Sequence, residues 1–171
     1  MTEKEQLEIL SILDNISSEA YKSTNDIAKK CKTDWIGMLR KLFCISALGY
    51  IKFTEIETVR NGTIKTSYAW KKLVDEEHTQ NIGNGMLKVL NYVREDNPDS
   101  TSVIAGRMKE NANIVLAKLL YLEYAGYVSC FRVRADKKIV AYTWKKLNDG
   151  GNINQDDKDE RQKRYRKECF R

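Results

Sequence analysis

The sequence predicts an α+β protein, dominated by helices, that is built from two tandem copies of one unit. Residues 67–73 read SYAWKKL and residues 141–147 read AYTWKKL, so five of the seven positions are identical. Before each heptapeptide, apolar residues recur at helical spacing, and a strand-like run then leads into the heptapeptide. A repeat of this kind indicates that each copy is one structural unit.

The register of the repeat sets the predicted domain boundaries. An offset of 77 residues pairs Gly49 with Gly126, whereas the offset between Trp70 and Trp144 is 74. The second copy is therefore three residues shorter, and a hairpin loop is where such a deletion is expected. The sequence divides into a first domain at 1–75, a linker at 76–85, a second domain at 86–148, and a charged tail at 149–171 that is flexible or marginally helical.

Each copy is expected to contain three helices followed by a β-hairpin. Ser23 and Ser100 are good N-cap residues for the second helix, and Gly49 and Gly126 are expected to end the third. In the first copy we expect helices over 5–16 and 24–31, a helix capped by Thr33 or Asp34 that ends at 48, and strands over 51–60 and 64–73 around Asn61-Gly62. In the second copy we expect helices over 86–95 and 101–108, a helix capped by Asn111 or Asn113 that ends at 126, and strands over 128–134 and 139–147.

Motifs for catalysis or metal binding are missing from the sequence. The chain has four cysteines, none in a C-x-x-C pair, and its single histidine is His78. This excludes a conventional zinc finger and most histidine-based catalysis. Phosphate-binding loops, zincin motifs and nucleophile elbows are absent too. We therefore expect a non-enzymatic protein without a metal or cofactor.

The charge distribution points to a polyanionic partner. The net charge is +6, and residues 86–147 hold 11 basic against 6 acidic residues. Such an excess favours nucleic acid or an acidic membrane surface. The longest apolar run is too short to span a bilayer, and the N-terminus lacks a signal-like apolar region. We expect a cytoplasmic protein without a membrane partner, associated with the nucleoid if its source is prokaryotic or viral.

Three helices and a hairpin, with glycine at the helix-to-strand junction, resemble the winged helix-turn-helix superfamily. The matching residues are Ser23-Thr24-x-x-Ile27-Ala28 with Leu48-Gly49-Tyr50-Ile51, and Ser100-Thr101-x-x-Ile104-Ala105 with Ala125-Gly126-Tyr127-Val128. The resemblance implies that the third helix enters the DNA major groove and that the hairpin, or wing, reaches a neighbouring backbone or minor groove. It implies a duplex DNA-binding protein, either a transcriptional regulator or a nucleoid-associated factor.

Residue chemistry then selects the candidate DNA contacts. The second wing carries Arg132 and Arg134 where the first carries Glu55 and Glu57, so the second copy is expected to contact phosphate more strongly. An alternative pairs the acidic strand of one copy with the basic strand of another. The candidate DNA-binding residues are Lys32, Thr33, Arg40, Lys41, Lys72, Lys109, Asn111, Asn113, Lys118, Tyr121, Arg132, Arg134, Lys137, Lys138 and Lys146.

The third helices depart from the DNA-reading pattern because their expected outward faces are apolar. Those faces are Leu39, Arg40, Phe43 and Cys44 in the first copy and Leu116, Ala117, Leu120 and Tyr121 in the second. Either these side chains are core, or they bury against a protein partner or a second subunit. The alternative function is therefore a protein-interaction scaffold or homodimer. Single-stranded nucleic acid or RNA binding through Trp35 and Tyr121 is a weaker third alternative.

The remaining aromatic and basic residues have more ordinary explanations. Trp70 and Trp144 are expected to pack against the helices rather than to stack on bases. The tail can form a helix from Asp156, because acids precede bases by four residues there. Its basic residues form either a DNA-binding arm or one face of a solvated tail.

Overall fold

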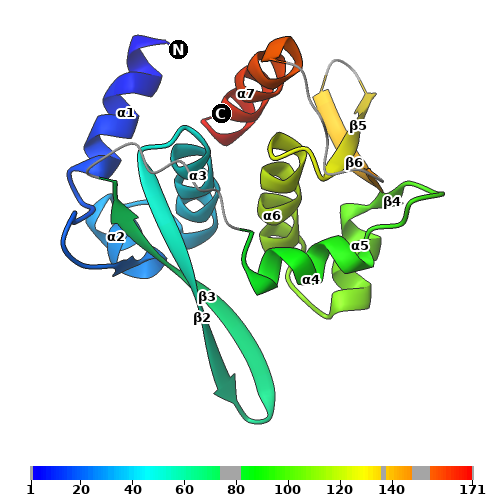
Figure 1. Ribbon diagram of the computed structural model, residues 1–171, viewed down its shortest axis with the longest axis horizontal. Helices are drawn as coiled ribbons and strands as arrows, with labels where there is room; N and C mark the ends of the chain where they lie inside the picture. The colour runs from blue at the N-terminus through cyan, green and yellow to red at the C-terminus, as the bar shows by residue number, and fades with distance from the viewer. Residues whose placement is uncertain (1, 74–81, 136–137, 148–154, 171) are drawn as a thin grey trace. The chain divides into compact units, whose positions relative to one another are not determined.

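The computed structural model describes residues 2–73, 82–135, 138–147 and 155–170. Over these residues the chain is α+β, with helices α1–α7 and two antiparallel sheets of three strands each (Figure 1). This confirms the predicted fold class. The chain divides into two compact units: unit 1 is Met1–Gly83 with Arg166–Arg171, and unit 2 is Asn84–Tyr165. None of the helices within the described ranges is long and apolar enough to cross a membrane.

Unit 1 contains a helical layer and a long β-hairpin. Its elements are α1 (Glu3–Leu13), β1 (Lys22–Ser23), α2 (Thr24–Lys30), α3 (Trp35–Ala47), β2 (Ile51–Arg60) and β3 (Thr63–Lys72). The strand order is β1-β3-β2, and Phe53 pairs with Trp70 in the β2–β3 register. Asn61 and Gly62 form the hairpin turn with φ values of 50° and 73°, as expected for an Asn-Gly turn.

Unit 2 repeats this order. Its elements are α4 (Asn84–Tyr92), β4 (Asp99–Ser100), α5 (Thr101–Met108), α6 (Ala112–Tyr124), β5 (Val128–Ala135) and β6 (Lys138–Lys146), with strand order β4-β6-β5. The β5–β6 register shifts between Val133 and Arg134. The predicted order of three helices and a hairpin is thus confirmed in both copies. The strands β1 and β4 were not predicted, since two-residue strands have no readable alternation.

The helix caps are equivalent in the two units. Ser23 Oγ accepts a hydrogen bond from Asp26 N–H, and Ser100 Oγ accepts one from Val103 N–H. Of the alternatives left open for the third helices, Asp34 caps α3 and Asn111 caps α6. Gly49 and Gly126, which follow these helices, both have φ of 85°, the left-handed conformation that glycine adopts without strain.

Each tryptophan of the repeated heptapeptide is buried in the core of its own unit. Trp70 and Trp144 are both 0% exposed. Trp70 Nε1–H donates to Thr24 Oγ1 at 2.8 Å, and Trp144 Nε1–H donates to Thr101 Oγ1 at the same distance. In unit 1, Phe43 packs edge-on against Trp70, with ring centroids 5.2 Å apart. The expectation that these tryptophans pack against the helices is confirmed.

The tail contains a helix, α7 (Gln155–Cys169), whose residues are divided between the two units. In unit 2, Arg161 Nη1–H donates to Glu123 O at 2.9 Å, and the Tyr165 ring stacks on Tyr124 at 5.5 Å. In unit 1, Arg40 Nη2–H donates to Glu168 O at 2.9 Å. Both acceptors are carbonyls in the last turn of a helix, where donors are scarce. Each unit therefore contacts, through side chains, the part of this helix that belongs to it.

Candidate nucleic-acid interface

The turn between α5 and α6 presents polar side chains at the start of a helix. Lys109 has a left-handed backbone with φ of 54°, and Glu110 N–H donates to Ala105 O at 3.1 Å, which closes the C-terminal end of α5. Asn111 Oδ1 accepts from Asn113 N–H at 2.9 Å. The side chains of Lys109, Asn111 and Asn113 are exposed. Three predicted contact residues are thus brought together beside the N-terminus of α6.

An internal ion pair supports this turn. Lys118 Nζ lies 3.2 Å from both carboxylate oxygens of Glu110, and the Lys118 side chain is only 2% exposed. The prediction that Lys118 contacts DNA is therefore corrected. In the structure its ammonium group lies inside and holds the residue that precedes the N-cap of α6.

Beyond its first turn, α6 is buried on nearly all sides. Val115 and every residue from Ala117 to Glu123 are buried. Burial raises the pKa of the Tyr121 phenol, and Tyr124 and Tyr127 add smaller effects of the same sign. Tyr121, another predicted contact, is therefore an interior side chain. The fully exposed residues of α6 are confined to its N-terminal turn.

The apolar side chains of the expected outward faces are mostly core. Those that are buried are Leu39, Phe43, Cys44, Ala117, Leu120 and Tyr121. This agrees with the first of the two explanations given for them, that they are core residues. A protein partner would have to use another surface.

The wing of unit 2 offers two exposed cations. Arg134 and Lys138 are exposed near the end of the β5–β6 hairpin, and Lys137 lies outside the described residues. Arg132 instead forms a two-pronged ion pair with Glu123, with Nη–Oε distances of 3.1 and 2.8 Å. Its guanidinium also lies 6.0 Å from the centre of the Tyr142 ring. Only part of the basic wing predicted from the sequence is therefore open to phosphate.

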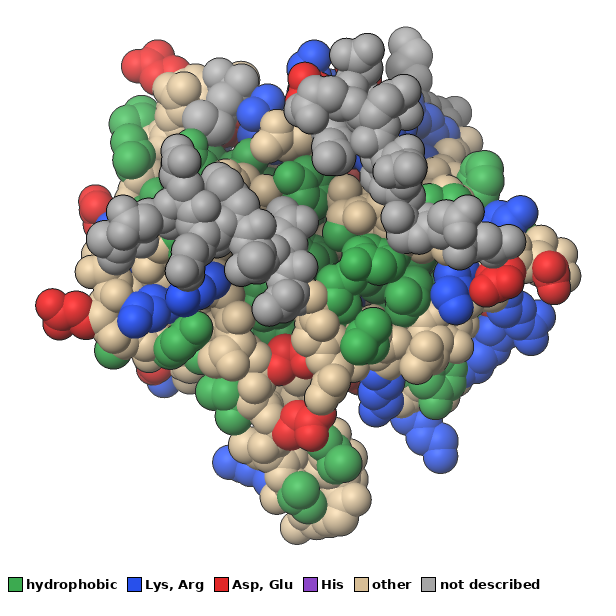
Figure 2. Space-filling view, viewed as in Figure 1, with side chains coloured by type: hydrophobic (Ala, Val, Ile, Leu, Met, Phe, Trp, Pro, Cys, Tyr) green, Lys and Arg blue, Asp and Glu red, His purple; other side chains and the backbone are tan. Residues whose placement is uncertain are grey.

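Internal pairing accounts for four of the five described acids of residues 84–147. Besides Glu110 and Glu123, Asp99 lies 2.6 Å from Arg107 and 3.6 Å from Arg94, and Glu95 lies 3.5 Å from Lys146. The cations of residues 84–147 that form no ion pair with described residues are Lys88, Lys109, Arg134, Lys138 and Lys145. Figure 2 shows basic side chains gathered on the α5 side of this unit. The surface of unit 2 therefore carries unbalanced positive charge.

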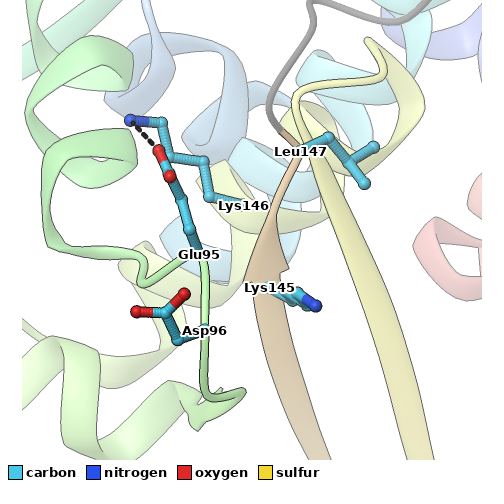
Figure 3. A pocket seen from close by; sticks show the side chains of 5 residues that line it. All are labelled: Glu95, Asp96, Lys145, Lys146 and Leu147. Carbon is cyan, nitrogen blue, oxygen red and sulfur yellow. Dashed lines mark ion pairs between the residues drawn. The ribbon is translucent and has the colours of Figure 1, made fainter.

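The two lysines in the heptapeptide of unit 2, Lys145 and Lys146, lie on opposite sides of their strand. Figure 3 shows Lys146 turned toward Glu95, with which it forms an ion pair, and Lys145 turned away from it. With Asp96 and Leu147 they line an open pocket of about 490 Å³. The Lys146 backbone N–H donates to Arg94 O at 2.9 Å, as Lys72 N–H does to Ser17 O in unit 1. Because both signs of charge line this pocket, it does not form a simple anion site.

Unit 1 differs from unit 2 at the same turn. Most of its predicted DNA-contacting residues already have partners within the protein. Lys41 pairs with Glu8, Thr33 Oγ1–H donates to Cys31 O at 3.2 Å, and Arg40 binds the end of α7. Lys32 is exposed, with φ of 52°, and Lys72 is half-buried. The N-cap of α3 is Asp34, whose carboxylate accepts from Gly37 N–H at 2.7 Å. A carboxylate at this point disfavours a phosphate, whereas the neutral Asn111 of unit 2 does not.

Some basic residues of α7 have partners within the protein, whereas others are exposed. Arg161 binds Glu123 O, and Arg166 lies 3.7 Å from Glu5. Lys163, Arg164 and Lys167 are exposed. The sequence signal for this packing is the i, i+4 spacing of Tyr165 and Cys169, which are both buried. That signal is easily missed, because charged residues dominate the segment.

Over the described residues, no group of three or more His, Cys, Asp or Glu side chains is placed to hold a metal ion. None of the four cysteines, all of which lie in the described ranges, forms a disulfide bond. Comparison with protein-family models and with curated proteins finds no match to this chain.

Proposed function

We propose that the chain is a pair of tandem winged-helix domains that binds duplex DNA, mainly through unit 2. The element order supports this proposal. In each unit a short strand before the second helix pairs with the closing strand of the hairpin, as β1 does with β3 and β4 with β6. That pairing makes each hairpin continuous with the helical core, so that helix and wing can approach one duplex together.

The observation that carries the proposal is the exposed N-terminus of α6, which is flanked by exposed polar and basic side chains. Lys109, Asn111 and Asn113 surround it, and no carboxylate caps it. Backbone N–H groups at a helix N-terminus attract phosphate, and nearby lysine adds to that attraction. Arg134 and Lys138 on the wing provide a second group of phosphate contacts.

Burial of α6 limits how DNA can be read. Because residues 117–123 are buried, we expect base contacts to be confined to the first turn of the helix. Phosphate contacts position a protein without reading sequence. We therefore infer that affinity is dominated by phosphate contacts with low sequence specificity, which fits a nucleoid-associated factor better than a site-specific regulator.

The test is duplex binding by the full chain, measured as fluorescence anisotropy of a labelled duplex of mixed sequence over a series of salt concentrations. The triple variant Lys109→Gln, Arg134→Gln, Lys138→Gln should bind roughly tenfold or more weakly at moderate salt. Its log–log salt slope should be shallower by about 0.9 for each phosphate that the variant no longer neutralises.

The matched control is Lys4→Gln, Lys29→Gln, Lys30→Gln, which removes the same charge from exposed positions of unit 1. It should change affinity much less. Equal weakening in the two triple variants would mean that net charge alone drives binding. A flat salt response, or no binding at low salt, would remove the proposal in favour of a protein-interaction role.

A further inference from the structure

The wing of unit 1 is longer than its counterpart and extends away from the helices of that unit (Figure 1). Its strands have ten residues each and are joined by the tight Asn61–Gly62 turn. Every residue from 56 to 65 is exposed. The outer half of the hairpin is thus a bare two-stranded ribbon.

The end of this ribbon carries an exposed apolar pair. Val59 and Ile64 are directly opposite each other in the register and therefore lie on the same face. Val59 is 70% exposed and Ile64 is 57% exposed. Figure 2 shows hydrophobic side chains at the end of the projecting hairpin. An apolar pair at such a position has no role in the core of unit 1.

Cations accompany the apolar pair. Residues 58–65 contain Arg60 and Lys65 and no acid, and neither cation forms an ion pair with the described residues. Arg60 and Lys65 lie on the ribbon face opposite to Val59 and Ile64, because side chains alternate along each strand. The nearest acid, Glu57, is on the apolar face, two residues nearer the base of the hairpin.

We propose that this tip is a wedge for duplex DNA, in which Val59 and Ile64 press between base pairs from the minor groove while Arg60 and Lys65 contact the flanking phosphates. Apolar wedges of this kind unstack a base step and bend the duplex. The flanking positive charge favours DNA over a protein partner as the occupant. Glu57 would meet phosphate if the ribbon entered further, so only the Val59–Ile64 pair inserts.

The inference rests on the proposed DNA binding and adds a second activity to it. Unit 2 supplies most of the affinity through phosphate contacts, and the wing of unit 1 supplies the bend. The two activities should then separate by mutation, since the wedge residues are distant in sequence from Lys109, Arg134 and Lys138.

The experiment measures binding and bending together with the full chain. A duplex labelled at both ends reports bending by energy transfer, and anisotropy of a singly labelled duplex reports affinity. Wild-type protein should raise the energy transfer. The variant Val59→Thr, Ile64→Thr keeps the β-branched shape of both residues, so the hairpin should stay folded. It should return the energy transfer to that of free duplex while weakening affinity less than about threefold.

The matched control is Leu7→Ala, Leu10→Ala on α1, two apolar residues that are 62% and 57% exposed. It should bend DNA as the wild type does. Binding without bending, or bending that survives in the threonine variant, overturns the wedge alone. Absence of wild-type binding overturns the proposed function as well. A fall in sedimentation mass of the threonine variant relative to wild type would show that the tip docks a second copy, which also overturns the wedge.

Discussion

Lys118 Nζ lies 3.2 Å from both carboxylate oxygens of Glu110, so the middle of α6 holds the turn that begins it. The two partners are not equally buried, since the lysine side chain is 2% exposed and the glutamate 26%. Removing one partner of a buried pair leaves the other charge without compensation, and that cost is larger for the deeper group.

We predict that Glu110→Ala destabilises the protein more than Lys118→Met. The first should lower the free energy of unfolding by about 2–4 kcal/mol, because it removes the carboxylate that compensates the charge of a buried ammonium. The second leaves a glutamate that water can reach, and should cost only about 1 kcal/mol. Urea denaturation monitored by tryptophan fluorescence gives both values. The opposite ranking would mean that the remaining contacts of the lysine compensate its charge.

This ion pair also marks the limit of what local sequence patterns reveal. The α+β class, the order of elements in both copies, the caps and the Asn61-Gly62 turn all depend on local signals, and these predictions are confirmed. The number of charged residues in a segment, however, does not reveal which of them form ion pairs with each other. The sequence predicts that Lys118 and Arg132 contact DNA, but each forms an ion pair inside unit 2. The acidic partner lies eight residues away in the sequence for Lys118 and nine for Arg132.

The orientation of the third helices could not be predicted for a different reason. A helix that is buried on nearly all sides has no polar stripe, so its phase cannot be read from hydrophobic periodicity. Leu39, Phe43 and Leu120 were expected on an outward face and are buried. The packing of α7 depends on two widely spaced side chains, Tyr165 and Cys169, and its charged composition concealed it.

The tryptophan–threonine hydrogen bonds should contribute differently to the two units. Thr24 Oγ1 is buried and also donates to Tyr68 O at 3.3 Å, whereas Thr101 is only half-buried. Thr24→Val leaves the indole N–H of Trp70 without an acceptor and should cost about 1–3 kcal/mol. Thr101→Val should cost less because water can substitute. Thermal denaturation of both variants tests the order, and Thr24→Ser, which keeps the hydroxyl, should recover part of the stability.

Two lysines with a left-handed backbone conformation allow effects on stability to be distinguished from effects on DNA binding. Lys32 and Lys109 have φ of 52° and 54°, a conformation that costs a side chain about 1 kcal/mol relative to glycine. Lys32→Gly and Lys109→Gly should each raise the melting temperature. Only Lys109→Gly should also weaken duplex binding strongly and reduce the salt slope by about 0.9. Comparable decreases of affinity in the two variants would contradict the assignment of DNA contact to unit 2.

We predict that the buried phenol of Tyr121 makes the free energy of unfolding decline at alkaline pH. Burial raises the pKa of this phenol above its ordinary value of about 10, so the folded state holds the proton more tightly than the unfolded state does. The stability contributed by this group is complete below about pH 10 and falls as the pH rises above that value. Tyr121→Phe should flatten the decline of the unfolding free energy above pH 10 by up to about 1.4 kcal/mol per pH unit. Tyr92→Phe, at an exposed position, should leave the decline unchanged.

The N-caps of α3 and α6 offer the sharpest test of how the two units divide the binding. Asp34 and Asn111 occupy equivalent positions and each caps its helix. Asp34→Asn keeps an N-cap side chain and removes a charge of the wrong sign, so duplex affinity should rise. Asn111→Asp should lower it, since about 1 kcal/mol of repulsion between unit charges about 4 Å apart in water corresponds to roughly fivefold. Anisotropy titrations at one salt concentration measure both. If the double swap restores wild-type affinity, the two helix N-termini contribute equally to phosphate binding; if it leaves affinity low, unit 2 dominates, as we propose.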